Sequence, residues 1–239
     1  MWQVYAVWLN NPLLFPTFTD TARAFFRGPC ARGNSAGATF HSVGLLVQGY
    51  ALGLLFAAIA TALAITTRIG ADLLETLTSM FNPLPSIALL PLAMIWFGLG
   101  EGSIIFVLIH AVLWSVALNT HSGFKSVSPT WRMVGQNYGL SQIAYVTKIL
   151  IPGALPSILT GLKIGWAFAW RTLIAAELVF GVSSSGGGLG WYIFQNKNML
   201  EIPNVFAGLL MVIVFGLLVD NFVFRTLERR TIRRWGMQS

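Results

Sequence analysis

Five ionisable side chains interrupt stretches of the sequence that are otherwise apolar: His110, Lys163, Arg171, Glu177 and Asp220. Asp220, near the end of the last span, should meet a neighbouring helix or lipid headgroups. An ionisable group in such a stretch is costly unless it faces a cavity or a partner group. Arg171 could attract an anion along a pathway or bridge two helices, and Glu177 could serve either structural bonding or function. Because six residues turn a helix by about 600°, Arg171 and Glu177 should neither share a face nor pair directly.

The other residues near these positions have plainer interpretations. A single histidine such as His110, without a partner histidine, is typical of a helix–helix hydrogen bond. Lys163 follows Pro156 closely, so its ammonium should extend towards lipid headgroups. Trp170 directly precedes Arg171, and although indoles favour packing or interfacial anchoring, we group it with Arg171 and Glu177 as the candidate substrate pathway.

The motifs that would indicate catalysis or metal binding are missing from the sequence. It has no His-Glu-x-x-His, no Gly-x-Ser-x-Gly and no paired aspartates. Cys30 is the single cysteine, which excludes an intrachain disulfide and a thiolate metal site. The glycine-rich run at 186–190 lacks the Gly-Lys-Ser/Thr ending of a phosphate loop, so nucleotide binding is not expected. A re-entrant turn or a contact with a partner protein is favoured instead. We therefore predict no catalytic residue, no metal site and no cofactor.

The elements that position the ionisable residues are long apolar helices. Only 10% of the 239 residues are charged, whereas a soluble domain carries about 25%. Charge-free runs of 35, 25 and 23 residues begin at Gly33, Thr76 and Gly102, and each exceeds the roughly 20 residues that cross a bilayer. A soluble enzyme, a disordered chain and a disulfide scaffold are thereby excluded. The sequence predicts an all-α, multi-pass membrane protein with spans near residues 43–66, 77–97, 104–119, 155–179 and 205–224.

Prolines and turn residues refine this division. Pro83, Pro85 and Pro91 predict a kink or break in the second span, and Pro152 and Pro156 should mark the start of the fourth. Thr19 or Asp20 should cap a short helix before the first span. The predicted parts are an N-terminal loop and short helix (1–42), a transmembrane domain (43–224) and a basic tail (225–239).

The distribution of Lys and Arg predicts the orientation. Nine of these residues fall on the side that holds residues 120–150 and the tail, and four fall on the other side. The excess of basic residues marks the cytoplasmic side. The net charge of +7 is therefore a topology signal, and no nucleic-acid partner is expected.

The segment 120–150 has the most informative pattern. Leu140, Ile143, Val146 and Leu150 recur at helical spacing and should lie on one side of a helix over residues 133–150. Gly139 should interrupt this helix with a turn or a close backbone approach. Such a helix suits either docking of a soluble partner or a position flat on the lipid surface.

Two sets of residues resemble a known family. Gly139, nine residues and Ile149-Leu150-Ile151-Pro152 are similar to the cytoplasmic signature loop of binding-protein-dependent ABC transporter permeases, which reads Glu-Ala-Ala, three residues, Gly, nine residues, Ile-x-Leu-Pro. Met133-Val134-Gly135 stands where the family has Glu-Ala-Ala. The residues at 82–101, 155–162, 175–177 and 188–190 resemble the nitrate/sulfonate/taurine-type permeases.

The resemblance implies a type I ABC importer permease in the bacterial inner (cytoplasmic) membrane. Two copies would form the pathway, cytoplasmic ATP-binding subunits would dock on the signature loop and hold the ATP, and an extracytoplasmic solute-binding protein would deliver a small anion. The residues implied in coupling to the ATPase are Gly135, Gly139, Leu140, Ile143, Ile149 and Pro152. Members usually have a further span before residue 11, so a sixth, N-terminal helix is expected to be truncated here.

Two other classes remain as alternatives. A stand-alone secondary transporter or channel would need an ion-coupling cluster at mid-membrane, where the sequence offers only Arg171. An intramembrane enzyme would need the nucleophile–base pair or metal ligands that the sequence lacks. Co-purification with an ATPase subunit would separate the ABC permease from both of these alternatives.

Overall fold

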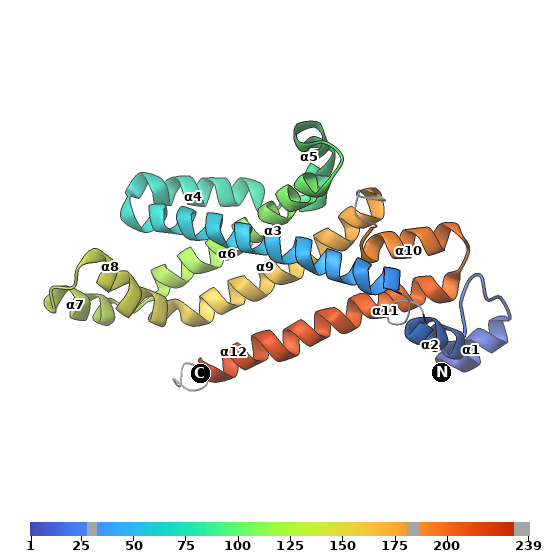
Figure 1. The fold of residues 1–239 in the computed structure, drawn as a ribbon. Helices are drawn as coiled ribbons and strands as arrows, with labels where there is room; N and C mark the ends of the chain where they lie inside the picture. The colour runs from blue at the N-terminus through green and yellow to red at the C-terminus, as the bar shows by residue number, and fades with distance from the viewer. Residues whose placement is uncertain (28–32, 181–186, 232–239) are drawn as a thin grey trace. The chain divides into compact units, whose positions relative to one another are not determined.

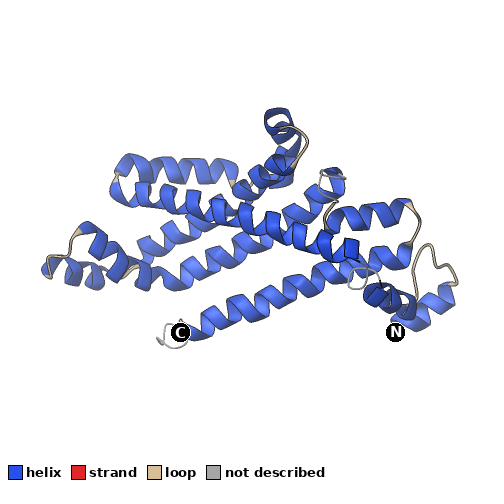
Figure 2. Cartoon of the chain, in the orientation of Figure 1, coloured by secondary structure: helices blue, strands red, loops and turns tan. Residues whose placement is uncertain are grey.

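The computed structural model describes residues 1–27, 33–180 and 187–231, and every regular element in these ranges is a helix (Figures 1 and 2). In chain order the helices are α1 Trp2–Leu9, α2 Phe18–Arg27, α3 Gly33–Thr66, α4 Arg68–Phe81, the 3-10 helix η1 Ser86–Leu89, α5 Leu90–Phe97, α6 Glu101–Ser126, α7 Pro129–Asn137, α8 Gln142–Tyr145, the π-helix η2 Val146–Leu150, α9 Ile151–Phe180, α10 Leu189–Asn198, α11 Ile202–Leu218, the π-helix η3 Val219–Phe224 and α12 Arg225–Arg230.

Four of the described helical stretches are long and apolar enough to cross a membrane: Thr39–Thr66, Glu101–Ser126, Gln142–Val179 and Ile202–Arg230. A fifth span is formed if α4 and the residues Ser86–Phe97 count as one, although the two parts are bent by 89°. These helices confirm the all-α, multi-pass fold.

The bend lies where prolines were expected to break the second span. Pro83 and Pro85 stand between α4 and η1 and provide no backbone N–H for a continuing helix. The charged residues Arg68, Asp72 and Glu75, which follow the first span, lie in the first turns of α4. Thr67 caps that helix, since its Oγ1 accepts a hydrogen bond from the Gly70 N–H at 2.9 Å.

The fourth span does not begin at its prolines. Helical structure runs without a break from Gln142 to Val179, and Pro156 lies inside α9. The expectation that Pro152 and Pro156 mark the start was therefore wrong. The π-helix η2 directly precedes Pro152, and its wider turn changes the hydrogen-bond register where the proline nitrogen has no hydrogen to donate.

The short helix near the N-terminus exists as expected, but its cap is a different residue. Helix α2 begins at Phe18, and Thr17 Oγ1 accepts from the Asp20 N–H at 3.1 Å, so the cap is Thr17 and not Thr19 or Asp20. The boundaries expected at 42–43 and 224–225 stay predictions.

The packing divides the chain into two compact units. Unit 1 comprises Met1–Gly49, Ser86–Leu108 and Ala169–Val219, and unit 2 comprises Tyr50–Pro85, Ile109–Phe168 and Asp220–Ser239. The core of unit 1 includes the fully buried side chains of Leu46, Leu90, Leu108, Leu173 and Leu189.

Small residues let the helices of unit 2 approach closely. A Cβ on Gly53 of α3 would lie 2.6 Å from Val112 Cβ, and one on Gly161 of α9 would lie 2.7 Å from Asn119 Cβ. Both contacts are with α6, and such glycines are the usual means of close helix packing in membranes. Helix α6 thus packs closely against both α3 and α9.

Candidate functional site

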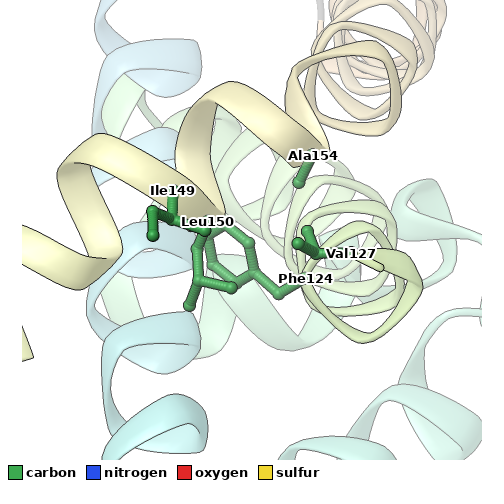
Figure 3. Close-up of a cluster of buried hydrophobic side chains, with 5 residues drawn as sticks. All are labelled: Phe124, Val127, Ile149, Leu150 and Ala154. Atoms are coloured by element: carbon green, nitrogen blue, oxygen red, sulfur yellow. The ribbon is translucent and has the colours of Figure 1, made fainter. Parts of the chain in front are cut away.

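The segment between α6 and α9 is held by a cluster of buried apolar side chains in unit 2. Figure 3 shows these side chains pointing toward one another from the end of α6 and from the η2–α9 turn. They are Phe124, Val127, Ile149, Leu150 and Ala154. Because the cluster contains residues from both ends of the segment, it anchors the start of α7 and the end of the stretch that follows α8. We refer to residues 127–152 as the coupling segment.

Gly139 forms the turn between α7 and α8. Its φ is +61°, in the left-handed region that favours glycine, and the Leu140 N–H donates to the Gly135 carbonyl at 3.2 Å. This six-to-one hydrogen bond is the closing bond of a Schellman motif. Ser141 then caps α8, since its Oγ accepts from the Ala144 N–H at 3.4 Å. The expected interruption at Gly139 is confirmed, and its cause is the end of one helix and the start of another.

Gly135 allows α7 to rest on the following helix. A Cβ at this position would lie 2.6 Å from Ile149 Cδ1 and 2.7 Å from Tyr145 Cδ2. Ile149 itself is buried in the cluster, and Pro152 follows η2 directly. Three of the residues expected to act in coupling therefore shape the backbone and packing of the segment.

The apolar face of the coupling segment differs from the expected one. Leu140, Val146 and Leu150 pack in or against the buried cluster, whereas Ile143 is 79% exposed. The prediction that Ile143 shares their side was wrong, because residues 133–150 form two helices and a π-turn and not one regular helix. Other large apolar side chains are exposed with it, namely Trp131, Met133, Val134 and Tyr138.

Glu177 lies in a buried cradle in unit 1. The residue is only 3% exposed. Its Oε1 accepts a hydrogen bond from Ser42 Oγ at 2.5 Å, and its Oε2 accepts one from the Gly190 N–H at 2.7 Å. Ser42 Oγ in turn accepts from the Leu189 N–H at 2.9 Å. The carboxylate and the hydroxyl together satisfy the first N–H groups of α10, and the carboxylate suits the positive end of that helix.

The glycines around this cradle are there because no side chain would fit. A Cβ on Gly190 would lie 2.6 Å from Glu177 Cβ and 2.7 Å from the Ile174 carbonyl oxygen. A Cβ on Gly188 would overlap the Glu177 carboxylate and Ser42 Oγ. The described part of the glycine-rich run is thus a helix start built around a carboxylate, while residues 181–186 lie outside the described residues.

Arg171 and Trp170 take different positions on α9. Arg171 lies on an exposed side of the helix, so it does not share a face with the buried Glu177, as the spacing predicted. Trp170 is buried in unit 1, where the centroid of its ring lies 4.8 Å from that of Phe215. Its Nε1 donates a hydrogen bond to the Val212 carbonyl at 3.3 Å. The three candidate pathway residues are therefore not brought together in one cluster.

Comparison with known proteins identifies the family. Residues 49–233 match the family model described as "Binding-protein-dependent transport system inner membrane component". The chain belongs to this family of ABC transporter permeases. It is an inner-membrane component with the type I ABC permease fold, and the resemblance carried by Gly139 and Pro152 is confirmed. Permeases of this class are non-catalytic membrane subunits.

Several curated permeases are similar to the chain. A putative ABC transporter permease protein of Methanocaldococcus jannaschii is 31% identical over 92% of this chain and 83% of the relative. The taurine transport system permease protein of Escherichia coli is 36% identical over 72% of this chain, and the nitrate import permease protein of Synechocystis is 32% identical over 74%. The chain spans about 60% of the length of these last two permeases.

The permease contains two polar pairings that sequence reasoning missed. Ser42 was not recognised as the partner of Glu177, and nothing in its apolar surroundings signals a contact 135 residues away. Lys163 was expected to reach the headgroups, but its Nζ lies 2.9 Å from Asp220 Oδ1 of η3. Opposite charges within two separate apolar stretches were a signal that could have found this second pair.

Proposed function

We propose that this permease is the membrane subunit of an ATP-driven importer, with its coupling segment as the docking site for a cytoplasmic ATP-binding subunit. The observation that carries this proposal is the supported apolar surface around Ile143. Its helices are fixed at both ends by the buried cluster, yet Ile143 and Tyr138 are 79% and 81% exposed. Exposed apolar side chains on a rigid support are typical of a protein interface.

Rigidity is what a coupling element requires. ATP binding and hydrolysis on the partner would have to move the spans, and a flexible tether would absorb that movement. The Schellman turn at Gly139 and the close contact of Gly135 with Ile149 support a lever that passes force into α9. The coupling residues Gly135, Gly139, Leu140, Ile149 and Pro152 would maintain the shape of this lever, and Ile143 would contact the partner.

The remaining parts of the proposed importer follow from the family description. A binding-protein-dependent system implies an extracytoplasmic solute-binding protein and ATP-binding subunits that hold the ATP. The four or five spans found among the described residues would form a wider path together with those of a second copy. We therefore infer a homodimer in a lipid bilayer.

We propose that the transported solute is a small anion. The printed names of similar permeases refer to taurine, aliphatic sulfonates and nitrate. The exposed position of Arg171 on α9 supports an anion in the pathway, because a cation inside an apolar span is retained where it serves a pathway or a partner. Glu177 and Trp170 would act on the pathway indirectly, by holding α10 and α11 beside α9.

The experiment is co-purification of the ATP-binding subunit with the permease. Ile143→Glu should abolish capture while membrane insertion stays intact, because it places a charge on the exposed surface without touching the cluster. Met199→Glu is the matched control, since Met199 is an exposed apolar residue in the turn after α10 of unit 1. Normal capture and uptake with Ile143→Glu would contradict the proposed docking site, and a permease that transports with no ATPase would support the stand-alone alternative.

A further inference from the structure

An ion pair joins two apolar helices of unit 2. Lys163 lies in α9 and Asp220 lies in η3, and Lys163 Nζ is 2.9 Å from Asp220 Oδ1. Both residues belong to stretches that are long and apolar enough to span the membrane. Ionised groups in such stretches are expensive against hydrocarbon. The pair should therefore face water, protein or lipid headgroups and not the hydrocarbon of the bilayer.

The pair is open rather than sealed. The Lys163 side chain is 50% exposed and the Asp220 side chain is 41% exposed. An ion pair of this kind contributes little to stability, so either charge can exchange its partner at low cost. Glu177 is the opposite case, because its carboxylate is buried and held by Ser42 and Gly190.

A second hydrogen-bond donor lies beside the lysine. Trp166 is three residues further along α9, so it is a neighbour of Lys163 on the helix surface. Its ring is 6.3 Å from that of Phe224 in η3, and its Nε1 is buried with no hydrogen-bond partner among the described residues. A buried N–H without an acceptor is unusual. Asp220, whose carboxylate pairs with the Lys163 ammonium, lies in the π-helix η3. Such π-helical turns are common at functional sites.

We propose that Lys163 contacts the solute during transport and exchanges the Asp220 carboxylate for the anionic group of the solute. When the spans move during transport, the buried Nε1 of Trp166 becomes accessible and donates a second hydrogen bond to that group. Before the solute arrives, Asp220 neutralises the ammonium; afterwards it takes the ammonium back and so helps the anion to leave. This inference rests on the proposed function, in which the solute is a small anion.

The test uses the complete transporter, with permease, ATPase and binding protein reconstituted in liposomes, and taurine, butanesulfonate and nitrate as probes. With saturating loaded binding protein, Lys163→Gln should lower the uptake rate of the transported probe about tenfold, the loss that one charged hydrogen bond predicts. Binding-protein-stimulated ATP hydrolysis should stay within about twofold, so that the ATP consumed per solute rises. Arg225→Gln, which removes a positive charge from α12 one turn after Asn221, is the control and should leave uptake unchanged.

The charge-exchanged variant Lys163→Asp/Asp220→Lys separates a transport role from a structural one. It restores an ion pair, so assembly and ATP hydrolysis should match those of the wild type while uptake stays low. Recovery of uptake would overturn the inference, because a structural ion pair tolerates the exchange. Normal uptake with Lys163→Gln would overturn it as well. If the wild-type transporter carries none of the three probes, the proposed solute class fails first; if it carries one and Lys163→Gln is silent, only this inference fails.

Discussion

Replacement of Gly139 tests whether the shape of the coupling segment depends on one backbone conformation. Its φ of +61° is costly for any residue with a Cβ, yet a Cβ there would meet no atom within 4 Å. The whole penalty of Gly139→Ala is therefore conformational, about 1–2 kcal/mol. That free energy corresponds to roughly a 5- to 30-fold increase in the open form of the turn. Gly139→Asn should cost less, because asparagine tolerates this region, and Gly139→Val should cost more.

Hydrogen exchange of the purified permease measures this opening directly. Amides of α8 and η2 should exchange roughly 5- to 30-fold faster in Gly139→Ala than in the wild type. Exchange should be slower in Gly139→Asn than in Gly139→Ala, and faster in Gly139→Val. Gly98→Ala is the matched control, since Gly98 has a φ of +76° and equally open surroundings but belongs to unit 1. It should leave exchange in α8 unchanged. Exchange in Gly139→Ala within twofold of wild type, or the same rate in the alanine and valine variants, would refute the reasoning.

The cradle and the α9–α11 contact give three further predictions, each measured by thermal unfolding in detergent. Gly190→Ala should lower the free energy of unfolding by about 1–3 kcal/mol through overpacking. Gly44→Ala is the control, because a Cβ there would meet no atom within 4 Å, and it should be neutral or stabilising. Equal effects of the two substitutions would contradict the packing argument. Ser42→Ala should cost about 2 kcal/mol or more, because it removes a donor from Glu177 and an acceptor from the Leu189 N–H; an unchanged midpoint would exclude the cradle. Trp170→Phe should cost only about 0.6 kcal/mol, the average for a hydrogen bond in a membrane protein, and a loss as large as that of Ser42→Ala would mean that the indole does more than bond Val212.

The sequence predicted the elements whose cause is local. Apolar runs gave the spans, Pro83 and Pro85 gave the break after α4, and Gly139 gave the turn. Each of these depends on the chemistry of a few neighbouring residues. Helix starts at prolines were predicted less well, because the π-turn of η2 accommodates Pro152 within a continuous helix.

The candidate site was predicted only in part because its contacts are long-range. Helical periodicity placed Ile143 with Leu140, but the turn rotates α8 relative to α7 and leaves Ile143 exposed. The role of Glu177 depends on Ser42, and that of Lys163 depends on Asp220. No periodicity within one helix reports a partner on another helix.

The cradle around Glu177 has a consequence for how the chain is made. Ser42 and Leu189 are 147 residues apart, which a ribosome takes about 7–30 s to span at ~5–20 residues per second. Ser42 of α3 is therefore synthesised well before Glu177 and the first turn of α10. Closure of the cradle is thus a late event of biogenesis, and a nascent chain halted before Glu177 would leave the hydroxyl of Ser42 without its native partners.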